Sequence, residues 1–425
     1  MGNNQFTYAE EMAMKAANLT AFSSINLRDI KNKVESLLGL IGRDGIFDEY
    51  TKHDISHING MLMSLDYIIP TKVKEQLTTA DWLLIVLSFY FHDLGMLVTK
   101  KEYENRSQSR EFQKFKTKYL ENIYNSSSVA TLDPDKQERF IFQEYVRKHH
   151  GERIANWILD ESSPFVSYDT NVSEVVAELV KNIPPLLKVD LAKECASHSL
   201  DDIDDFDKYK VSQSYGTTPQ ERANVFYAAL ILRTADLLHI TQDRTPIIEY
   251  RVIAPTNPVS QEEWAKQGAV ASVTPKIPID DDGNKRPELP SDTFEVNAYF
   301  ENERGFFSLI EYLNYVRIQL KNSFRLNEIA RKRHASLYDF PWKDIDDSSI
   351  QTKNFERKQL SFTIDQNKVL SLLVGETLYN NLSVSLRELA QNAIDAVKVR
   401  NYELHSTPIS VENGATRSRT SNCSA

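Results

Sequence analysis

The stretch Phe89-Tyr90-Phe91-His92-Asp93-Leu94-Gly95 ends a run of apolar residues that begins at Trp82. An imidazole and a carboxylate therefore stand side by side at the end of a segment that we expect to be a buried helix. Removing both groups from water costs free energy unless a partner or a cation compensates them. A hydrogen bond between the two side chains is one compensation. A divalent metal is the other, because imidazole nitrogen and carboxylate oxygen both suit zinc, iron and manganese.

Three further stretches place the same ligand types on segments with a helical pattern. They are His53-Asp54-Ile55-Ser56-His57, His149-His150, and the almost wholly apolar segment from Val225 to Ile240 that contains Arg233 and Asp236. A buried Asp236 needs a partner, and either Arg233 or a metal would serve. Four stretches of this kind favour a shared metal site over separate hydrogen bonds in the core.

The order of these motifs resembles the HD-domain phosphohydrolase superfamily over about residues 45–245. The resemblance implies an all-helical domain in which separate helices supply the ligands of a divalent metal such as Mn²⁺, Mg²⁺, Fe²⁺ or Zn²⁺. It implies His92 and Asp93 as the central ligand pair and Asp236 as the last ligand. The first ligand maps onto His57, and His53, one turn earlier on the same helix face, is the competing or second ligand.

The same resemblance implies hydrolysis of a nucleotide-type phosphoester: a dNTP, a nucleotide, or a cyclic nucleotide or dinucleotide. Asp93 would accept the proton, and Arg153 or Arg233 would stabilise developing charge. Adjacent helix residues point about 100° apart, so at most one of His149 and His150 is a direct ligand. We favour His150 for the metal or substrate and assign His149 an indirect or phosphate contact. His198 lies among Ser and Asp residues of an expected surface segment, and we leave it out of the site.

Composition narrows the class of partner and the compartment. The net charge is −10 and the pI about 5.5, so a small nucleotide is favoured over nucleic acid as the ligand. Two cysteines, Cys195 and Cys423, are too few for a disulfide framework or a thiolate zinc site. The N-terminus lacks the apolar core of a signal peptide, and no apolar run is long enough to span a bilayer. We therefore expect a cytoplasmic protein without a membrane partner, and a homo-oligomer stays open.

We predict a mainly α-helical chain of several parts. An HD domain with a helical lead-in covers 1–245, and a connecting region covers 246–355, in which seven of the fifteen prolines fall within 45 residues. Alternating apolar residues predict short strands at Ile248–Ile253 and Thr293–Phe300, and a long helix follows from about Phe307 to Lys332. Residues 405–425 are rich in Ser, Thr and Asn and are expected to be disordered.

A second motif lies in the range 356–404. Leu360–Ile364 is predicted to form a strand and Val369–Leu382 a helix. A further helix would then carry Glu388, Asn392 and Asp395 on one face. An ordinary amphipathic helix would have the same pattern.

The order of its residues resembles the first nucleotide motif of the GHKL ATPases, and of their heat-shock chaperone branch most. The resemblance implies that Glu388 orients water, Asn392 holds Mg²⁺ and Asp395 lines the nucleotide. The downstream Asp-x-Gly-x-Gly stretch and the phosphate lid of that family are missing from the 28 residues after Val397. We therefore expect an incomplete α/β GHKL fragment that binds Mg-ATP only if another part completes it.

HD and GHKL modules in one chain resemble an ATP-gated effector of bacterial phage defence. Two alternatives remain from the sequence. One is a chaperone-like or regulatory interaction protein with a non-catalytic HD domain, and the other is an HD nuclease.

Overall fold

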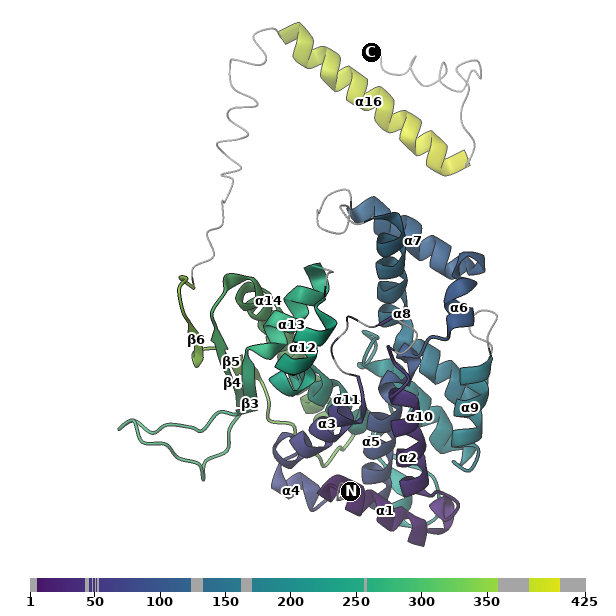
Figure 1. Cartoon of the computed structure of the whole chain (residues 1–425), viewed down its shortest axis with the longest axis vertical. Helices are drawn as coiled ribbons and strands as arrows, with labels where there is room; N and C mark the ends of the chain where they lie inside the picture. Colours follow the sequence, from purple (N-terminus) through teal and green to yellow (C-terminus); the bar gives the residue numbers. More distant parts are fainter. Residues whose placement is uncertain are drawn as a thin grey trace. The chain divides into compact units, whose positions relative to one another are not determined.

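The structure is a computed structural model, and it describes residues 6–42, 46–47, 49, 51, 53–123, 133–161, 170–255, 258–357 and 382–405. The chain forms two compact units, Met1–Arg357 and Lys358–Ala425. The first unit is a helical body with a small sheet at one side (Figure 1). Among the described residues, no helix has both the length and the hydrophobicity that a membrane span requires.

Helices dominate the chain up to residue 245, as the sequence predicts. Their bounds are α1 Tyr8–Met14, α2 Leu27–Leu38, α3 Ile55–Ile68, α4 Thr71–Lys74, α5 Thr79–Phe91, α6 Lys100–Glu104, α7 Arg110–Ile123, α8 Pro134–Leu159, α9 Asn171–Val180, α10 Pro185–Ser197 and α11 Val225–Leu238. A ribbon of two short antiparallel strands, β1 Gln213–Ser214 and β2 Arg222–Ala223, interrupts the otherwise helical region.

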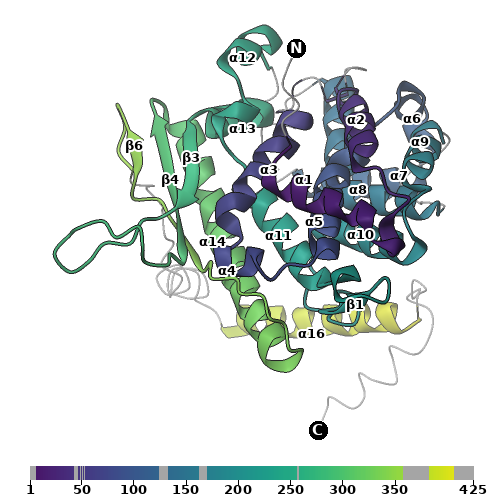
Figure 2. The same ribbon diagram turned by 90° about the horizontal axis from the view of Figure 1, so that it is seen from below.

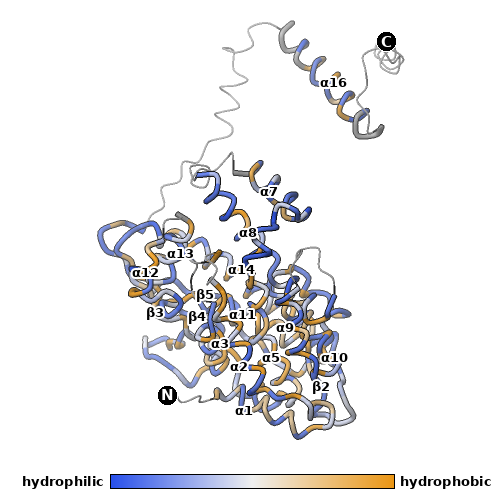
Figure 3. The backbone as a smooth tube through the Cα atoms, turned by 45° about the vertical axis from the view of Figure 1, so that its right-hand side comes forward, coloured by the Kyte–Doolittle hydropathy of each residue, from blue (hydrophilic) through white to orange (hydrophobic). Residues whose placement is uncertain are grey.

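Helix α5 is the centre of the core. Thr78 caps its first turn together with Asp81, and every residue from Ala80 to Phe91 is buried. A helix that is apolar on all sides must be surrounded by other elements. Helices α1, α3, α10 and α11 all contact α5, and Figure 2 shows α1, α3 and α11 beside it. The hydropathy colouring in Figure 3 marks α5 and its neighbours as the hydrophobic part of the unit.

The range 246–355 packs onto these helices and completes the same unit. Its elements are α12 Ile247–Ile253, α13 Pro258–Gly268, β3 Val270–Pro275, β4 Thr293–Phe300, α14 Glu303–Arg333, β5 Asp344–Asp346 and β6 Ile350–Thr352. Strand β4 pairs antiparallel with β3 and parallel with both β5 and β6. Trp342 Nε1 donates to the carbonyl of Ile68, and Tyr67 donates to that of Val273. The core is therefore continuous across residue 245.

The two strands predicted in this range had different outcomes. Thr293–Phe300 is β4, as predicted, but Ile248–Ile253 belongs to helix α12 rather than to a strand. Pro246 precedes the helix and Ala254 ends it in the left-handed conformation. A strand needs a partner for its backbone groups, whereas a helix satisfies its own. The alternating apolar side chains are left largely exposed, with Ile248 78% and Val252 80% accessible.

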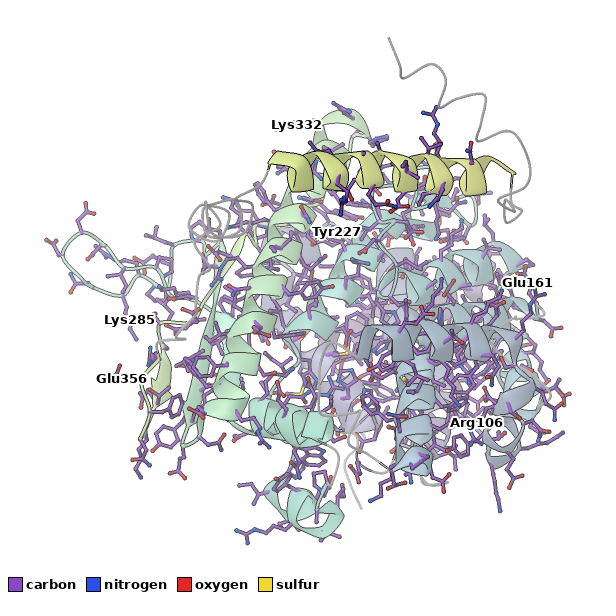
Figure 4. All side chains as sticks on the ribbon, turned by 90° about the horizontal axis from the view of Figure 1, so that it is seen from above. Arg106, Glu161, Tyr227, Lys285, Lys332 and Glu356 are labelled. Carbon is purple, nitrogen blue, oxygen red and sulfur yellow. The ribbon has the colours of Figure 1, made fainter. Side chains whose placement is uncertain are left out.

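The loop between β3 and β4 extends away from the helices, and Lys285 lies on it (Figure 4). Tyr227 of α11, also labelled there, is fully buried and donates to the carbonyl of Asp339. In the second unit, helix α16 spans Leu382–His405 and contains the predicted motif helix. The predicted strand at 360–364 and almost all of the predicted helix at 369–382 lie outside the described residues.

Arg153 of α8 forms a fully buried ion pair in the first unit. Its guanidinium donates to both carboxylate oxygens of Glu102 and to the carbonyls of Gly95 and Leu97. Arg153→Met should lower the free energy of unfolding by about 3–5 kcal/mol, because Glu102 keeps its charge without its partner. Lys33→Met, which breaks the exposed pair with Asp29, should cost less than about 1 kcal/mol. Equal losses in denaturant unfolding would contradict this role of Arg153.

Glu194 of α10 predicts a pH-dependent stability. Burial, with the neighbouring charge of Asp190, raises the pKa of Glu194 well above its ordinary value. The folded protein therefore keeps a proton that the unfolded chain releases. Stability should be full below the ordinary glutamate pKa of about 4.3 and fall as the pH rises above it, by at most about 1.4 kcal/mol per pH unit. Glu194→Gln should remove this slope in unfolding curves measured from pH 5 to 8; an unchanged slope would refute the assignment.

Candidate metal centre

His92 and Asp93 lie in a short 3₁₀ turn, His92–Met96, that directly continues α5. Both are buried. His92 Nδ1 lies 2.9 Å from the carbonyl oxygen of Phe89. Because a carbonyl only accepts, Nδ1 must carry a proton, and in the neutral imidazole the free lone pair is on Nε2. Local structure thus presents this imidazole in the form that binds a metal.

Two other helices bring His57 and Asp236 to the same point. His57, in the first turn of α3, has its Nε2 3.4 Å from Asp93 Oδ2 and 3.6 Å from Asp236 Oδ1. His92 Nε2 lies 3.3 Å from the same Asp93 oxygen. Ligand atoms of His57, His92 and Asp236 all lie within 4.8 Å of one another. The structure therefore brings together the four residues that the sequence proposes as principal ligands.

A second group of potential ligands uses the other oxygen of Asp93. His150 of α8 has its Nε2 3.7 Å from Asp93 Oδ1 and 2.5 Å from His198 Nε2. His150 Nδ1 donates to the carbonyl of Arg147, so in the neutral imidazole the lone pair is on Nε2, the nitrogen that faces His198 and Asp93. Asp93, His150 and His198 form a compact set of potential ligands. Of the adjacent pair, His150 faces the cluster, while His149 contacts Glu152.

Sequence reasoning missed His198. It follows α10, in a turn that Arg233 holds by donating to the carbonyls of Ser197 and Leu200. Its surroundings in the sequence, rich in Ser and Asp, suggested a surface position, and no periodic pattern marks it. Arg233 also donates to Gln319. Its contacts with the turn therefore help to fix the position of His198.

Three potential ligand atoms of the cluster are buried without a hydrogen-bond partner among the described residues, namely His57 Nε2, His92 Nε2 and Asp93 Oδ2. The contacts of 3.4 and 3.3 Å from the two imidazole nitrogens to Asp93 Oδ2 are electrostatic and poorly aligned for hydrogen bonds. Buried polar atoms in native proteins nearly always have partners, and leaving them unsatisfied is costly. A divalent cation fits this set, which offers nitrogen and oxygen donors without thiolates.

The pKa shifts of Asp93, His57 and His198 favour the deprotonated forms that bind a metal. Burial disfavours the charge on Asp93, but the adjacent His92 holds the pKa of that carboxyl well below its usual range. Burial, reinforced by Arg244, lowers the pKa of His57 well below normal. Burial and the neighbouring His150 lower the pKa of His198 to about 3. His92 is the exception: burial lowers its pKa, but Asp93 outweighs it and raises the value to about 9. A proton on His92 and a cation would compete for the same carboxylate.

His57 is oriented by a chain of side chains that the sequence did not reveal. Its Nδ1 lies 2.7 Å from Nδ1 of His239, and His239 Nε2 lies 3.3 Å from Asp243 Oδ2. With Nδ1–H of His57 donating, Nε2 of His57 faces the cluster. Gly60 makes room for this chain, since a Cβ there would lie 2.3 Å from His239 Nε2.

His53 and Arg153 were predicted site residues that the structure places differently. His53 Nδ1 donates to the carbonyl of Thr51, and its Nε2 accepts from Arg244. His53 is in neither of the two groups of potential ligands, whereas His57 is in the first. Arg153 points to Glu102 and the backbone of the 3₁₀ turn, and so its guanidinium holds the turn rather than facing the ligand atoms. Gly95 permits this close packing, because a Cβ there would lie 1.9 Å from the carbonyl oxygen of His150.

The residues of the second motif lie on α16. Asn392 and Asp395 are exposed, and Asp395 contacts Gln391 and Lys398. The described residues of this unit form no nucleotide site around them, and the position of Glu388 on the same helix follows from its place in the sequence.

Comparison with known proteins places this centre in a family. The chain shows no significant similarity to a curated protein or to a solved structure. A family model described as HD-CE matches residues 47–322, nearly two thirds of the chain. The match contains every residue of the two ligand groups and extends through α13 and β4 into α14. The chain therefore belongs to the HD-CE family.

Proposed function

We propose that this protein is a metal-dependent phosphohydrolase that acts on a nucleotide-type phosphoester. The observation that carries the proposal is the cluster of two carboxylates and several imidazoles, in which His57 Nε2, His92 Nε2 and Asp93 Oδ2 are buried without a hydrogen-bond partner among the described residues. Membership of an HD-type family supports it. The alternative is a regulatory protein whose HD domain is not catalytic, so metal content and turnover must be measured together.

In this proposal His57, His92, Asp93 and Asp236 hold one cation, and Asp93, His150 and His198 offer a position for a second. A bound cation of this kind polarises a phosphoryl oxygen and lowers the pKa of a bound water. The residues around it orient the ligands and exclude bulk water, since His57 and His92 are almost completely buried. Asp236 is about one third exposed, so the site is open on the side of α11.

Regulation by the second unit is part of the proposal. Helix α16 carries the motif that resembles a GHKL ATPase, and a nucleotide site completed by further residues would couple Mg-ATP to the phosphohydrolase. The exposed Asn392 and Asp395 are consistent with a helix that lacks its binding partner. The resemblance of paired HD and GHKL modules to effectors of bacterial phage defence is the ground for proposing a role there.

The hydrolase proposal is tested with the metal itself. Protein treated with a chelator should lose turnover of bis(p-nitrophenyl) phosphate and regain it with Mn²⁺. Asp93→Asn should retain the helical circular dichroism but lose both the metal, measured by elemental analysis, and at least about 100-fold of the turnover, because one residue serves both ligand groups. Undiminished turnover in Asp93→Asn would place the chemistry elsewhere. Stoichiometric metal without any phosphoester turnover would favour the regulatory alternative.

The orienting chain predicts an effect from residues that touch no cation. His239→Ala should weaken Mn²⁺ binding about 10- to 100-fold in calorimetry, as removal of the partner of a ligating histidine does elsewhere. Gly60→Ala should act in the same direction, because the new methyl group displaces the His239 ring. His149→Ala is the matched control, since His149 contacts Glu152 outside the cluster. Wild-type affinity in both His239→Ala and Gly60→Ala would show that His57 needs no orientation.

A further inference from the structure

A cavity of about 340 Å³ lies beside the metal centre. Its walls come from the segment before α3, from α8, from α13 and from Tyr312 of α14. Part of the wall therefore belongs to the helical region that carries the ligands, and part to the range after residue 245. The volume falls in the range of pockets that bind small molecules.

His53 and Arg244 connect this cavity to the ligand cluster. Both line the cavity, and Arg244 Nη2 lies 3.1 Å from His53 Nε2. The ring of His53 is 6.2 Å from that of His57. Arg244 also donates to the carbonyl of His239, the residue that orients His57. A molecule with its phosphoester at the cluster would pass these two side chains and continue into the cavity.

Charges around the cavity are paired rather than of one sign. Arg147 contacts Glu144 at 2.6 Å, and Lys266 contacts Glu263 at 2.5 Å. Aromatic residues, including Trp264 and Tyr312, contribute apolar surface. A chain of phosphates would need an excess of cations here. The lining is suited instead to an uncharged planar group with polar edges.

Gln267 of α13 supplies a specific polar feature. Its side chain lines the cavity, is 6% exposed, and has an Oε1 without a hydrogen-bond partner among the described residues. Its Nε2 donates to Glu263 Oε2 at 3.3 Å. The opposite orientation of the amide would set two acceptors against each other, so Oε1 is the atom left to accept. A buried acceptor without a donor favours a ligand that brings an N–H group.

We infer that this cavity binds the base of a nucleotide, and that Gln267 selects a base with an exocyclic amino group. Gln267 Oε1 accepts from that amino group, and the aromatic residues contact the base. The phosphoester of the same molecule lies at the metal centre, past His53 and Arg244. The inference rests on the proposed function for this last point alone.

The test compares bases with and without an exocyclic amino group. AMP has an amino group where IMP has an oxygen, with a proton on the adjacent ring nitrogen of IMP, and CMP and UMP differ in the same way. Binding of each to the whole, chelator-treated protein is measured by calorimetry. The amino member of at least one pair should bind about 3- to 10-fold more tightly, the worth of one hydrogen bond. Gln267→Leu should abolish that preference.

The matched control is Gln76→Leu at an exposed glutamine after α4, which does not line the cavity; it should keep the preference. Equal binding within both pairs by the wild-type protein would overturn the inference, and so would a preference that survives Gln267→Leu. The wild-type comparison decides even if that variant does not fold. Turnover of bis(p-nitrophenyl) phosphate, which has no base, is scored separately. Absence of this turnover would remove the hydrolase proposal and leave a base-binding site. Turnover without a base preference would keep the hydrolase proposal and remove the base-binding inference.

Discussion

The carboxylate of Asp93 lies inside the protein, where imidazoles from several helices surround it. Burial alone would keep this group protonated, but the neighbouring histidines hold it in the ionised form. The cost of desolvating the cluster is offset only if the ligand positions are fixed accurately. Several hydrogen bonds and ion pairs of the unit fix these ligand positions. Arg153 ties α8 to the turn after α5, Arg233 holds the turn that carries His198, and Asp243 and His239 set the ring of His57.

The range after residue 245 belongs to the same folded unit as the helices before it and is not a separate domain. It supplies one wall of the cavity beside the cluster, and Trp342, which donates to the carbonyl of Ile68 in α3. The extent of the HD-CE match, to residue 322, agrees with this arrangement. The candidate metal ligands and part of the cavity wall thus come from different segments of one folded unit.

The sequence predicted the helical class and the convergence of His57, His92, Asp93 and Asp236, because each of these residues stands on an apolar segment that must be buried. It could not predict His198 or His239, which become neighbours of the cluster only through contacts between residues far apart in the chain. His53 was considered a ligand because it lies near His57 in sequence, but the backbone before α3 turns it toward Arg244. The strand expected at Ile248–Ile253 was wrong because alternation over six residues fits either a strand or a short helix. The second motif is confirmed as a helix, and its nucleotide role stays a prediction.

Asp93 offers one oxygen to each of the two ligand groups. Two cations that shared this carboxylate would not bind independently. A first cation would fix the charge and orientation of the carboxylate that a second would use, and the two positive charges would repel each other. Whether the first cation strengthened or weakened the binding of the second, each would change the affinity for the other by the same factor. Metal occupancy would then not follow a simple hyperbola as the concentration of free metal rises. Through this one shared side chain, the two sites would bind metal with positive or negative cooperativity.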